Sequence, residues 1–267
     1  MRAYVINLAR SLDRRTHVMA ELDRTGLDYE FITAVDGRTI DLEDRRLVDP
    51  RLLAKNNFPA GTAGCALSHL QAYRRILEDG ADAALVLEDD VELPDDLGAL
   101  AHALAAHLTG AEVVLLNYAS PTRCRVSPEG SVPLASSRLL ALPIDITDMV
   151  NAAAYVITRP ACERMLESAP PIRANADDWH YFFTEGIIDR IRCVLPLPVD
   201  KAAKFESTIG LYSLGNGLKG RLVAPFVRHK VPLVHQVILY RRQRILRRWG
   251  KADIVDVPFV KKPSRLG

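Results

Sequence analysis

The sequence predicts a single α/β domain with a mostly parallel, Rossmann-like sheet, followed by a basic tail. Apolar strand-like runs alternate with amphipathic segments over the first 120 residues, which is typical of right-handed βαβ crossovers. The 267 residues are 48% hydrophobic and 25% charged, without a Gly/Ser/Pro-rich linker in the middle, as expected for one soluble globular domain. We assign the domain to residues 1–230 and the tail to residues 231–267.

The first elements alternate strand and helix. Residues 3–8 are a short apolar run, and Ser11 can cap a helix that ends at Gly26. Residues 29–35 form the next predicted strand, closed by the turn pair Asp36-Gly37. Residues 41–60 are charged and irregular, and they predict no regular element.

The next segment repeats the pattern. Apolar residues between Thr62 and Glu78 fall on one helical face, and Gly80 ends the helix. Strand 84–87 follows, then a helix capped by Asp95 or Asp96. The four leucines of that helix are Leu97, Leu100, Leu104 and Leu108, and strand 112–117 comes after it.

The middle of the chain is less regular. Residues 126–133 look like a turn between two short strands, and residues 151–158 look like a buried strand. Pro160 is expected as the first residue of the following helix.

The cysteines and the apolar runs indicate an intracellular protein. Cys65, Cys124, Cys162 and Cys193 are far apart and form no CxxC pair, so we expect reduced thiols rather than disulfides or structural zinc. Neither a secretory signal nor a run of about 18 apolar residues is present. A cytoplasmic protein is expected.

Three acids follow the strand at residues 84–87, where the strand should end. Glu88, Asp89 and Asp90 repel one another unless a cation lies among them. Ligands of α/β sheets bind beyond the carboxyl ends of the strands, and hard carboxylate oxygens suit Mg²⁺ or Mn²⁺ together with a phosphate. The pattern favours a nucleotide-diphosphate site; the alternative is a solvated acidic loop.

Polar residues also end the first strand. The strand ends in Asn7, Leu8, Ala9 and Arg10, and Arg14 and Arg15 follow. Guanidinium groups pair well with phosphate, so these residues fit the same site if the two strands are neighbours. Solvent-facing arginines on the outer face of a helix are the alternative.

Four segments together carry a resemblance to a known family. VINLARSLDRR at the N-terminus, GCALSHLQAYRRILEDG at 64–80, the following ALVLEDDV and NAAAYVITRPACERML at 151–166 resemble glycosyltransferase family 25. That family of lipooligosaccharide glycosyltransferases includes bacterial β-galactosyltransferases and is related to collagen galactosyltransferases. The similarity covers residues 1 to about 215, and residues 120–148 match nothing.

The resemblance implies a GT-A-like fold and an inverting transfer from a nucleotide sugar. By position, it implies that Glu88 and Asp90 hold Mn²⁺ or Mg²⁺, that Asp89 contacts the donor, and that Asp178 lies where the family has a further Asp. FESTIG matches a Ser-x-Ile pattern through Ser207 and Ile209. The residues implied to line the donor site are Asn7, Leu8, Arg10, Arg14, Ser68, His69, Glu88 and Asp89. The acidic residue that many members have before the GC pair is absent from Gly61-Thr62-Ala63-Gly64.

Transfer to a hydroxyl needs a base within about 3 Å of the acceptor oxygen. We predict Asp178, with Asp177 as the second choice, because Asp177 can instead cap the helix that begins DWHYFF. Trp179 and Tyr181 can stack on a sugar or belong to the core. His69 can be a site residue or a structural histidine, and His229 or His235 could complete a metal shell.

The tail supplies a further expectation. Residues 241–267 hold nine Lys and Arg against two Asp, whereas the whole chain has a net charge of +2. Residues 231–251 predict a basic amphipathic helix that suits an anionic membrane surface; packing on its own domain is the alternative, and no nucleic-acid partner is expected.

The resemblance implies galactose transfer from UDP-galactose to a lipooligosaccharide or similar glycan precursor, and the basic tail would place this activity at the inner membrane face. The alternative is a non-catalytic nucleotide-sugar-binding or membrane-surface protein that keeps the fold. A phosphohydrolase would need a second His and Asp constellation, which the sequence does not offer.

Overall fold

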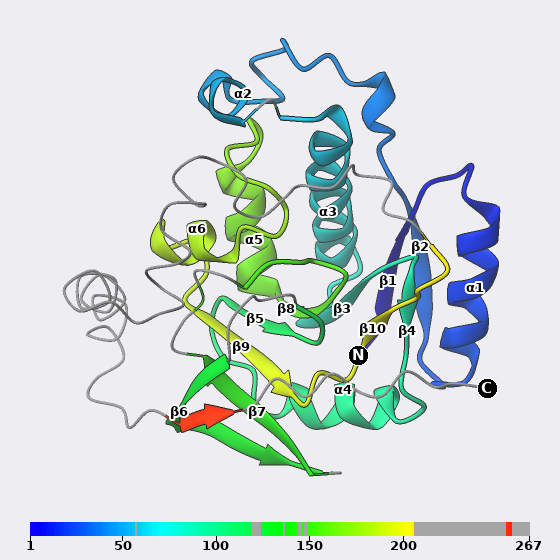
Figure 1. Ribbon diagram of the computed structural model, residues 1–267, viewed down its shortest axis with the longest axis vertical. Helices are drawn as coiled ribbons and strands as arrows, with labels where there is room; N and C mark the ends of the chain where they lie inside the picture. The colour runs from blue at the N-terminus through cyan, green and yellow to red at the C-terminus, as the bar shows by residue number, and fades with distance from the viewer. Residues whose placement is uncertain are drawn as a thin grey trace, which may run out of the picture.

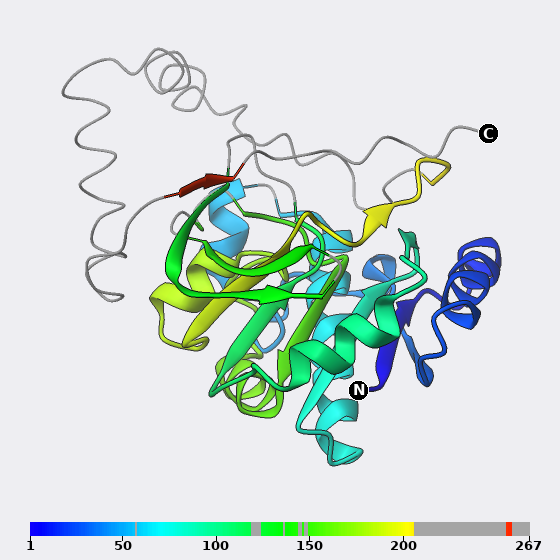
Figure 2. The same ribbon diagram turned by 90° about the horizontal axis from the view of Figure 1, so that it is seen from below.

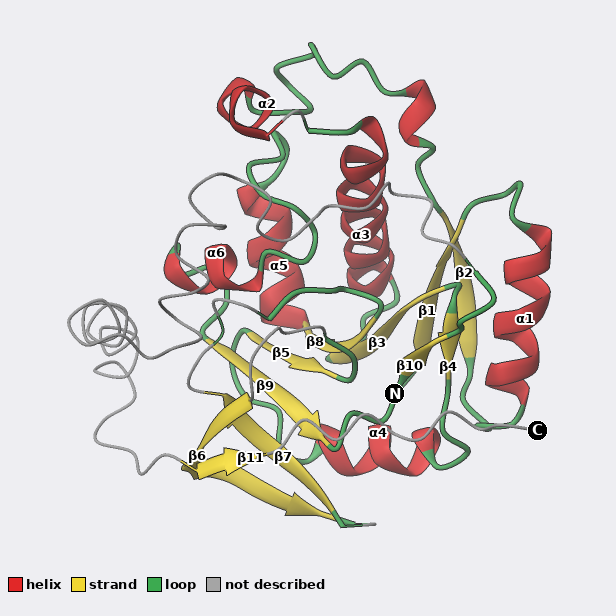
Figure 3. Ribbon diagram, in the orientation of Figure 1, coloured by secondary structure: helices red, strands yellow, loops and turns green. Residues whose placement is uncertain are grey.

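The computed structural model describes residues 1–56, 58–118, 124–135, 137–143, 146, 149–205 and 255–257. A nine-stranded sheet crosses the molecule, with helices on both faces (Figures 1 and 3). In spatial order the strands are β11 (Val255–Val257), β6 (Cys124–Leu134), β7 (Arg138–Pro143), β9 (Arg190–Leu195), β5 (Glu112–Leu115), β8 (Ala154–Thr158), β3 (Ala83–Glu88), β1 (Ala3–Asn7) and β2 (Tyr29–Thr33).

The strand directions make the sheet mixed. β2, β1 and β3 are parallel neighbours, and β5 is parallel to β9. β8 runs antiparallel between β3 and β5, so those two strands share one direction. β7, β6 and β11 extend the far edge through antiparallel pairs. The predicted α/β fold with a Rossmann-like sheet between helices is confirmed, with an antiparallel extension that the sequence did not predict.

Alternating side chains distribute the core between the two faces. Tyr4 and Ile6 of β1 pack in the cluster that contains α3, α5 and α6, whereas Val5 packs with α1 and α4. α1 lies beside the edge formed by β1 and β2 (Figures 1 and 2). The helices are α1 (Leu12–Asp23), α2 (Pro50–Asn56), α3 (Ala60–Glu78), α4 (Leu97–Ala105), α5 (Arg159–Ser168) and α6 (Trp179–Thr184), with a 3-10 turn η1 at Gly37–Thr39.

Most predicted elements are confirmed to within a few residues. Ser11 and Asp96 are the N-cap residues of α1 and α4, although neither side chain bonds the helix backbone. Residues 41–60 contain α2, which the sequence did not predict. The turn expected at 126–133 is wrong, because β6 runs through it as one strand with an irregular register between Ser127 and Val132.

A short antiparallel pair frames the edge of the sheet. β4 (Val91–Glu92) follows the end of β3 and pairs with β10 (Asp200–Lys201), with Lys201 opposite Val91. The backbone N–H of Ala202 donates to the carbonyl oxygen of Asp90 at 2.7 Å. This pairing brings residues near 200 to the acids that follow β3.

Candidate functional site

Glu88, Asp89 and Asp90, which we call the acidic turn, lie where the parallel strands β1 and β3 end. Ile6 of β1 is in register with Glu88 of β3, so Asn7 and the acids meet at one edge. Asp89 and Asp90 are buried, whereas Glu88 is partly exposed. The expectation that the first strand and the acidic turn are neighbours is confirmed, and the alternative of a solvated acidic loop is wrong.

Asp89 is held by two donors from the N-terminal segment. Nδ2 of Asn7 donates to Oδ2 at 2.7 Å, and a guanidinium N–H of Arg14 donates to Oδ1 at 3.0 Å. The Arg14 side chain is 11% exposed and that of Asp89 is 10% exposed, so the ion pair is largely shielded from water. Both oxygens of Asp89 therefore have protein partners.

Glu88 and Asp90 share a different cation. The ammonium group of Lys201 lies 3.2 Å from Oε2 of Glu88 and 3.7 Å from Oδ2 of Asp90. Oδ1 of Asp90 is buried and has no hydrogen-bond partner among the described residues. Burial, and then the charge of Glu88, raise the pKa of Asp90, although Lys201 and Arg14 oppose this. Burial would lower the pKa of Lys201, but Glu88 and Asp90 raise it overall.

The three acids therefore do not converge on one point. Asp89 accepts from Asn7 and Arg14, and Glu88 lies beside Lys201. Asp90 lies between the two cations, 3.4 Å from Arg14 and 3.7 Å from Lys201. Glu88 and Asp90 offer hard carboxylate oxygens of the kind that Mn²⁺ and Mg²⁺ prefer, and Oδ1 of Asp90 is buried without a partner among the described residues. The assignment of a metal ion to Glu88 and Asp90 stays a prediction.

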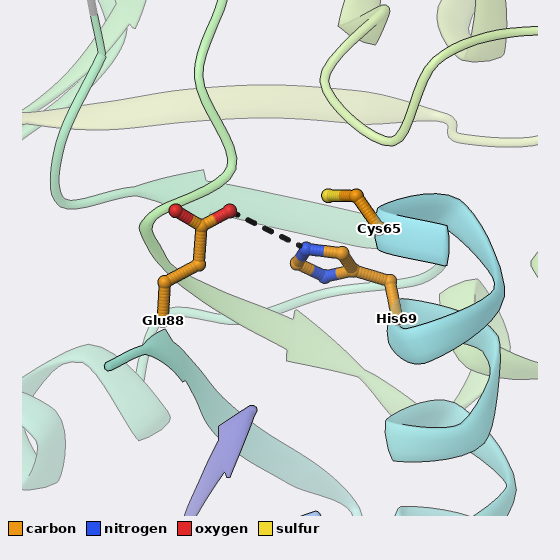
Figure 4. A group of neighbouring side chains, drawn as sticks. All are labelled: Cys65, His69 and Glu88. Atoms are coloured by element: carbon orange, nitrogen blue, oxygen red, sulfur yellow. Dashed lines mark ion pairs between the residues drawn. The ribbon is translucent and has the colours of Figure 1, made fainter. Parts of the chain in front are cut away.

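Glu88 also faces α3. Oε1 of Glu88 lies 3.8 Å from Nε2 of His69, and Cys65 projects from the same side of the helix (Figure 4). Nδ1 of His69 is 2.7 Å from the hydroxyl of Tyr155, and that hydroxyl is 2.7 Å from the hydroxyl of Tyr73. His69 is thus placed beside the acidic turn, whereas Cys65 is a site neighbour that sequence analysis treated only as a core thiol.

The remaining predicted donor residues lie at the same edge or just behind it. Ser68 donates to the carbonyl of Gly64 at 2.6 Å and accepts from the backbone N–H of Val35 at 2.8 Å, so its hydroxyl fastens the loop after β2 to α3. Arg10 forms an ion pair with Asp36 at the end of the neighbouring strand. Leu8 is partly buried directly after Asn7.

The two candidate bases have different environments. Asp178 is the N-cap of α6, and its Oδ1 accepts from the backbone N–H of Tyr181 at 3.2 Å. Asp177 instead accepts from the backbone N–H of Asn151 at 3.0 Å. The suggestion that Asp177 caps α6 is wrong, because Asp178 is the capping residue. Burial raises the pKa of Asp177, the bond from Asn151 opposes this, and the negative charge of Glu88 adds to the rise.

Two asparagines that the sequence analysis did not single out connect Asp177 to the sheet. Nδ2 of Asn151 donates to Oδ1 of Asn117 at 2.5 Å, and Asn117 donates to the carbonyl of Val199 at 2.7 Å. Asn151 has a φ of 101°, a conformation that few residues other than glycine adopt. The sequence signals were that Asn117 ends the apolar run 112–117 and that Asn151 begins the family-like segment at 151–166.

Trp179 belongs to the core and is not a sugar platform. It is fully buried, and its indole N–H donates to the carbonyl of Asn151 at 3.0 Å. Its ring meets Tyr155 edge to face at 5.1 Å. Of the two alternatives for Trp179, core packing is confirmed and sugar stacking is wrong, whereas Tyr181 is partly buried.

Several expectations concern residues beyond the described part of the chain. The basic helix at 231–251, His229, His235 and the Ser-x-Ile pattern all lie outside the described residues. Within the described ranges, none of the helices has both the length and the apolar character needed to cross a membrane. Among the described residues, Cys65, Cys162 and Cys193 are not in disulfide bonds.

Comparisons with known proteins agree on one family. The chain is 35% identical over 95 residues to the "Glycosyltransferase 25 family member" of Aedes aegypti, covering 33% of this chain and 16% of the relative. It is 30% identical over 95 residues to "Procollagen galactosyltransferase 1" of Danio rerio, with the same coverage of 33% and 16%. It is also 30% identical over 100 residues to the "Inactive glycosyltransferase 25 family member 3" of Mus musculus, covering 35% of this chain and 17% of the relative.

These matches span about a sixth of the length of the curated relatives. Among solved structures, apo UDP-glucose pyrophosphorylase aligns with a TM-score of 0.40 at 10% identity, covering 73% of this chain and 89% of that one. The family model described as "Glycosyltransferase family 25 (LPS biosynthesis protein)" matches residues 1–180, which contain the acidic turn, the Cys65 to His69 helix segment and both candidate bases. The chain therefore belongs to glycosyltransferase family 25.

Proposed function

We propose that this family member is a metal-dependent, inverting glycosyltransferase that transfers galactose from UDP-galactose to a hydroxyl of a lipooligosaccharide or other cell-surface glycan precursor. The observation that supports it most is the Glu88 and Asp90 pair, which lies around Lys201 at the sheet edge, with Oδ1 of Asp90 buried and without a partner in the described part of the chain. The procollagen galactosyltransferase relative supports the choice of sugar.

The donor side of the proposal uses the edge formed by β1 and β3. Glu88 and Asp90 would hold Mn²⁺ or Mg²⁺, which when bound supplies a Lewis acid for the departing diphosphate. Arg14 pairs with Asp89 at 3.0 Å and with Asp90 at 3.4 Å. These ion pairs would hold the turn in one conformation in the ligand-free protein. Leu8 and Arg10 extend the same edge toward the nucleotide.

We assign the role of general base to Asp177 rather than Asp178. Asp178 is occupied by its bond to the N-terminal turn of α6, whereas Asp177 accepts from the backbone N–H of Asn151 through Oδ2 and lies close enough to Glu88 to feel its charge. A raised pKa makes Asp177 a stronger base than an ordinary carboxylate. Asp177 would accept the acceptor hydroxyl proton in a single displacement.

Paired variants test this assignment. We expect UDP release from UDP-galactose with a glycan acceptor to require Mn²⁺, to stop in EDTA, and to be lost in Asp90→Asn. Asp177→Asn should lose turnover about 10²-fold or more while UDP binding is retained. Asp178→Asn is the matched control, because Asn caps a helix as well as Asp does. Equal rates in the two aspartate variants would remove Asp177 from the mechanism.

A second candidate function is a non-catalytic protein that binds a nucleotide sugar. The observation that favours it is Lys201, whose ammonium group already neutralises Glu88 and Asp90 without a divalent ion. Saturable UDP-sugar binding by calorimetry, with no UDP or sugar product in the presence of Mn²⁺ and a range of acceptors, would favour this alternative.

We further propose that the protein works on the cytoplasmic face of a membrane, with residues 231–251 as the basic contact to anionic lipid. The support is the local charge of the sequence, nine Lys and Arg against two Asp from residue 241 onward. Truncation after Pro232 should abolish co-sedimentation with phosphatidylserine vesicles, and a full-length chain that never sediments with them would contradict this.

A further inference from the structure

A second group of potential ligands faces the acidic turn from α3. Cys65 and His69 are four residues apart and therefore lie on one side of the helix, opposite Glu88 at the end of β3 (Figure 4). Each residue offers one potential ligand atom: the Cys65 sulfur, a ring nitrogen of His69 and a carboxylate oxygen of Glu88. These three atoms lie within 4.8 Å of one another. Among the described residues, Glu88, Asp89 and Asp90 form no such group.

His69 provides an independent indication that a ligand belongs there. The residue is 2% exposed, and its Nε2 has no hydrogen-bond partner in the described part of the chain. A buried polar atom without a partner costs about 1–3 kcal/mol. Oε1 of Glu88 lies 3.8 Å from Nε2, which is too long for a hydrogen bond.

The other ring nitrogen of His69 is fixed from behind. Nδ1 lies 2.7 Å from the hydroxyl of Tyr155, which is itself 2.7 Å from the hydroxyl of Tyr73. Histidines that bind metals commonly have their second nitrogen held in this way, which sets the orientation of the ring. The two tyrosines therefore hold the free nitrogen of His69 toward Cys65 and Glu88.

The ligand types select the cation. A thiolate and an imidazole are borderline-soft or soft ligands that suit Zn²⁺, whereas Mg²⁺ and Mn²⁺ prefer oxygen. Three protein ligands leave one position for water in a four-coordinate site. The side chain of Glu88 is 21% exposed and Cys65 is only partly buried, so an ion can enter from the acidic turn.

We propose that Cys65, His69 and Glu88 form a binding site for a borderline-soft divalent cation such as Zn²⁺. This site differs from the oxygen-only pair of Glu88 and Asp90 but shares Glu88 with it. Cys65 would bind as the thiolate and release its proton to solvent. Because Glu88 also bonds Lys201, an ion in this site withdraws the carboxylate that the proposed Mn²⁺ or Mg²⁺ site needs. Zn²⁺ should then inhibit transfer; that consequence rests on the proposed function, but the binding site does not.

Cobalt spectroscopy of the full chain tests the site without an activity assay. Metal-free protein, reduced with a phosphine and titrated with Co²⁺, should develop a thiolate-to-cobalt charge-transfer band together with the visible bands of a four-coordinate ion. Zn²⁺ should displace both. Cys65→Ser should lose the charge-transfer band, and Tyr155→Phe, which removes only the hydroxyl behind His69, should weaken binding about 10- to 100-fold.

Cys162→Ala is the matched control, because Cys162 is a buried thiol on α5 outside the group, and it should leave the spectrum unchanged. If Cys65→Ser does not fold, a second test uses the unmodified chain. Zn²⁺ should then protect Cys65 from alkylation by iodoacetamide, as mapped by mass spectrometry. A charge-transfer band that survives in Cys65→Ser, the absence of any such band in the unmodified protein, or alkylation of Cys65 at the same rate with and without Zn²⁺ would each overturn the proposal. None of these readouts depends on sugar transfer, so failure of the site and failure of the proposed activity are distinguishable.

Discussion

Replacing Arg14 with Ala should destabilise the protein by about 3 kcal/mol at neutral pH. The Arg14 and Asp89 side chains are 11% and 10% exposed, and removing one partner of a buried ion pair costs about 3–5 kcal/mol. Asn7 still donates to Asp89 at 2.7 Å, which places the expected cost at the lower end. For a chain of this size, the loss corresponds to a fall in melting temperature of about 6–12 °C.

The deficit should also depend on pH. Arg14 is one of the charges that oppose the rise in the pKa of Asp90 caused by burial and Glu88. Without Arg14 this pKa rises further above its unfolded value, so ionised Asp90 opposes folding at neutral pH. The penalty is relieved as the pH falls through the folded-state pKa, because the protonated form predominates there. The stability difference between the two proteins should therefore shrink on acidification.

Urea unfolding followed by circular dichroism measures both effects between pH 7 and pH 4.5. Arg46→Ala is the matched control, since Arg46 forms a salt bridge with Asp44 while its own side chain is 90% exposed, and exposed pairs contribute about 0–1 kcal/mol. A loss below about 1 kcal/mol for Arg14→Ala, or a loss that stays constant with pH, would refute the view that Arg14 neutralises buried carboxylates.

Three further outcomes are expected. Lys201→Met should strengthen Mn²⁺ binding about tenfold in calorimetry, because a competing charge 3.2 Å from Glu88 is removed, whereas Lys201→Arg should leave it nearly unchanged; equal affinity in all three proteins would contradict competition between Lys201 and the ion. Asp178→Ala should cost about 1 kcal/mol of unfolding free energy through the lost cap, and a change within 0.2 kcal/mol would argue against the capping bond. If Asp177 is the base, kcat/KM should fall on acidification at a pH above that expected for an ordinary aspartate, because burial raises its pKa, and an acid limb unchanged in a residual-activity profile of Asp177→Asn would assign that limb to another group.

Local patterns predicted the parts of the fold that depend on nearby residues. The helical spacing between Thr62 and Glu78 and the apolar run before Glu88 are properties of single elements, and α3 and β3 lie where they were expected. The antiparallel insertion of β8 between β3 and β5 is a pairing choice made by the whole sheet. A buried apolar strand has the same sequence pattern in a parallel and in an antiparallel pair, so the direction of β8 could not be predicted from the sequence.

The candidate site shows the same division. The acids after β3 and the neighbouring Asn7 could be found, because strand ends in parallel sheets meet at one edge. Lys201 could not, since it is 113 residues from Glu88 and arrives through the β4 and β10 pairing. The choice between Asp177 and Asp178 depended on which of two adjacent residues takes the cap geometry, and composition is the same for both.

The acidic turn has a consequence for how such sequences are compared and altered. Asp89 accepts from Asn7 and Arg14, Glu88 pairs with Lys201, and Asp90 lies near both Arg14 and Lys201. The three consecutive acids therefore have different environments. Replacing Asp89 with Glu would conserve the charge yet move the carboxylate away from Asn7 and Arg14. Substitutions aimed at the proposed donor site should therefore leave Asn7, Arg14 and Asp89 unchanged as one hydrogen-bonded unit and vary the residues around them.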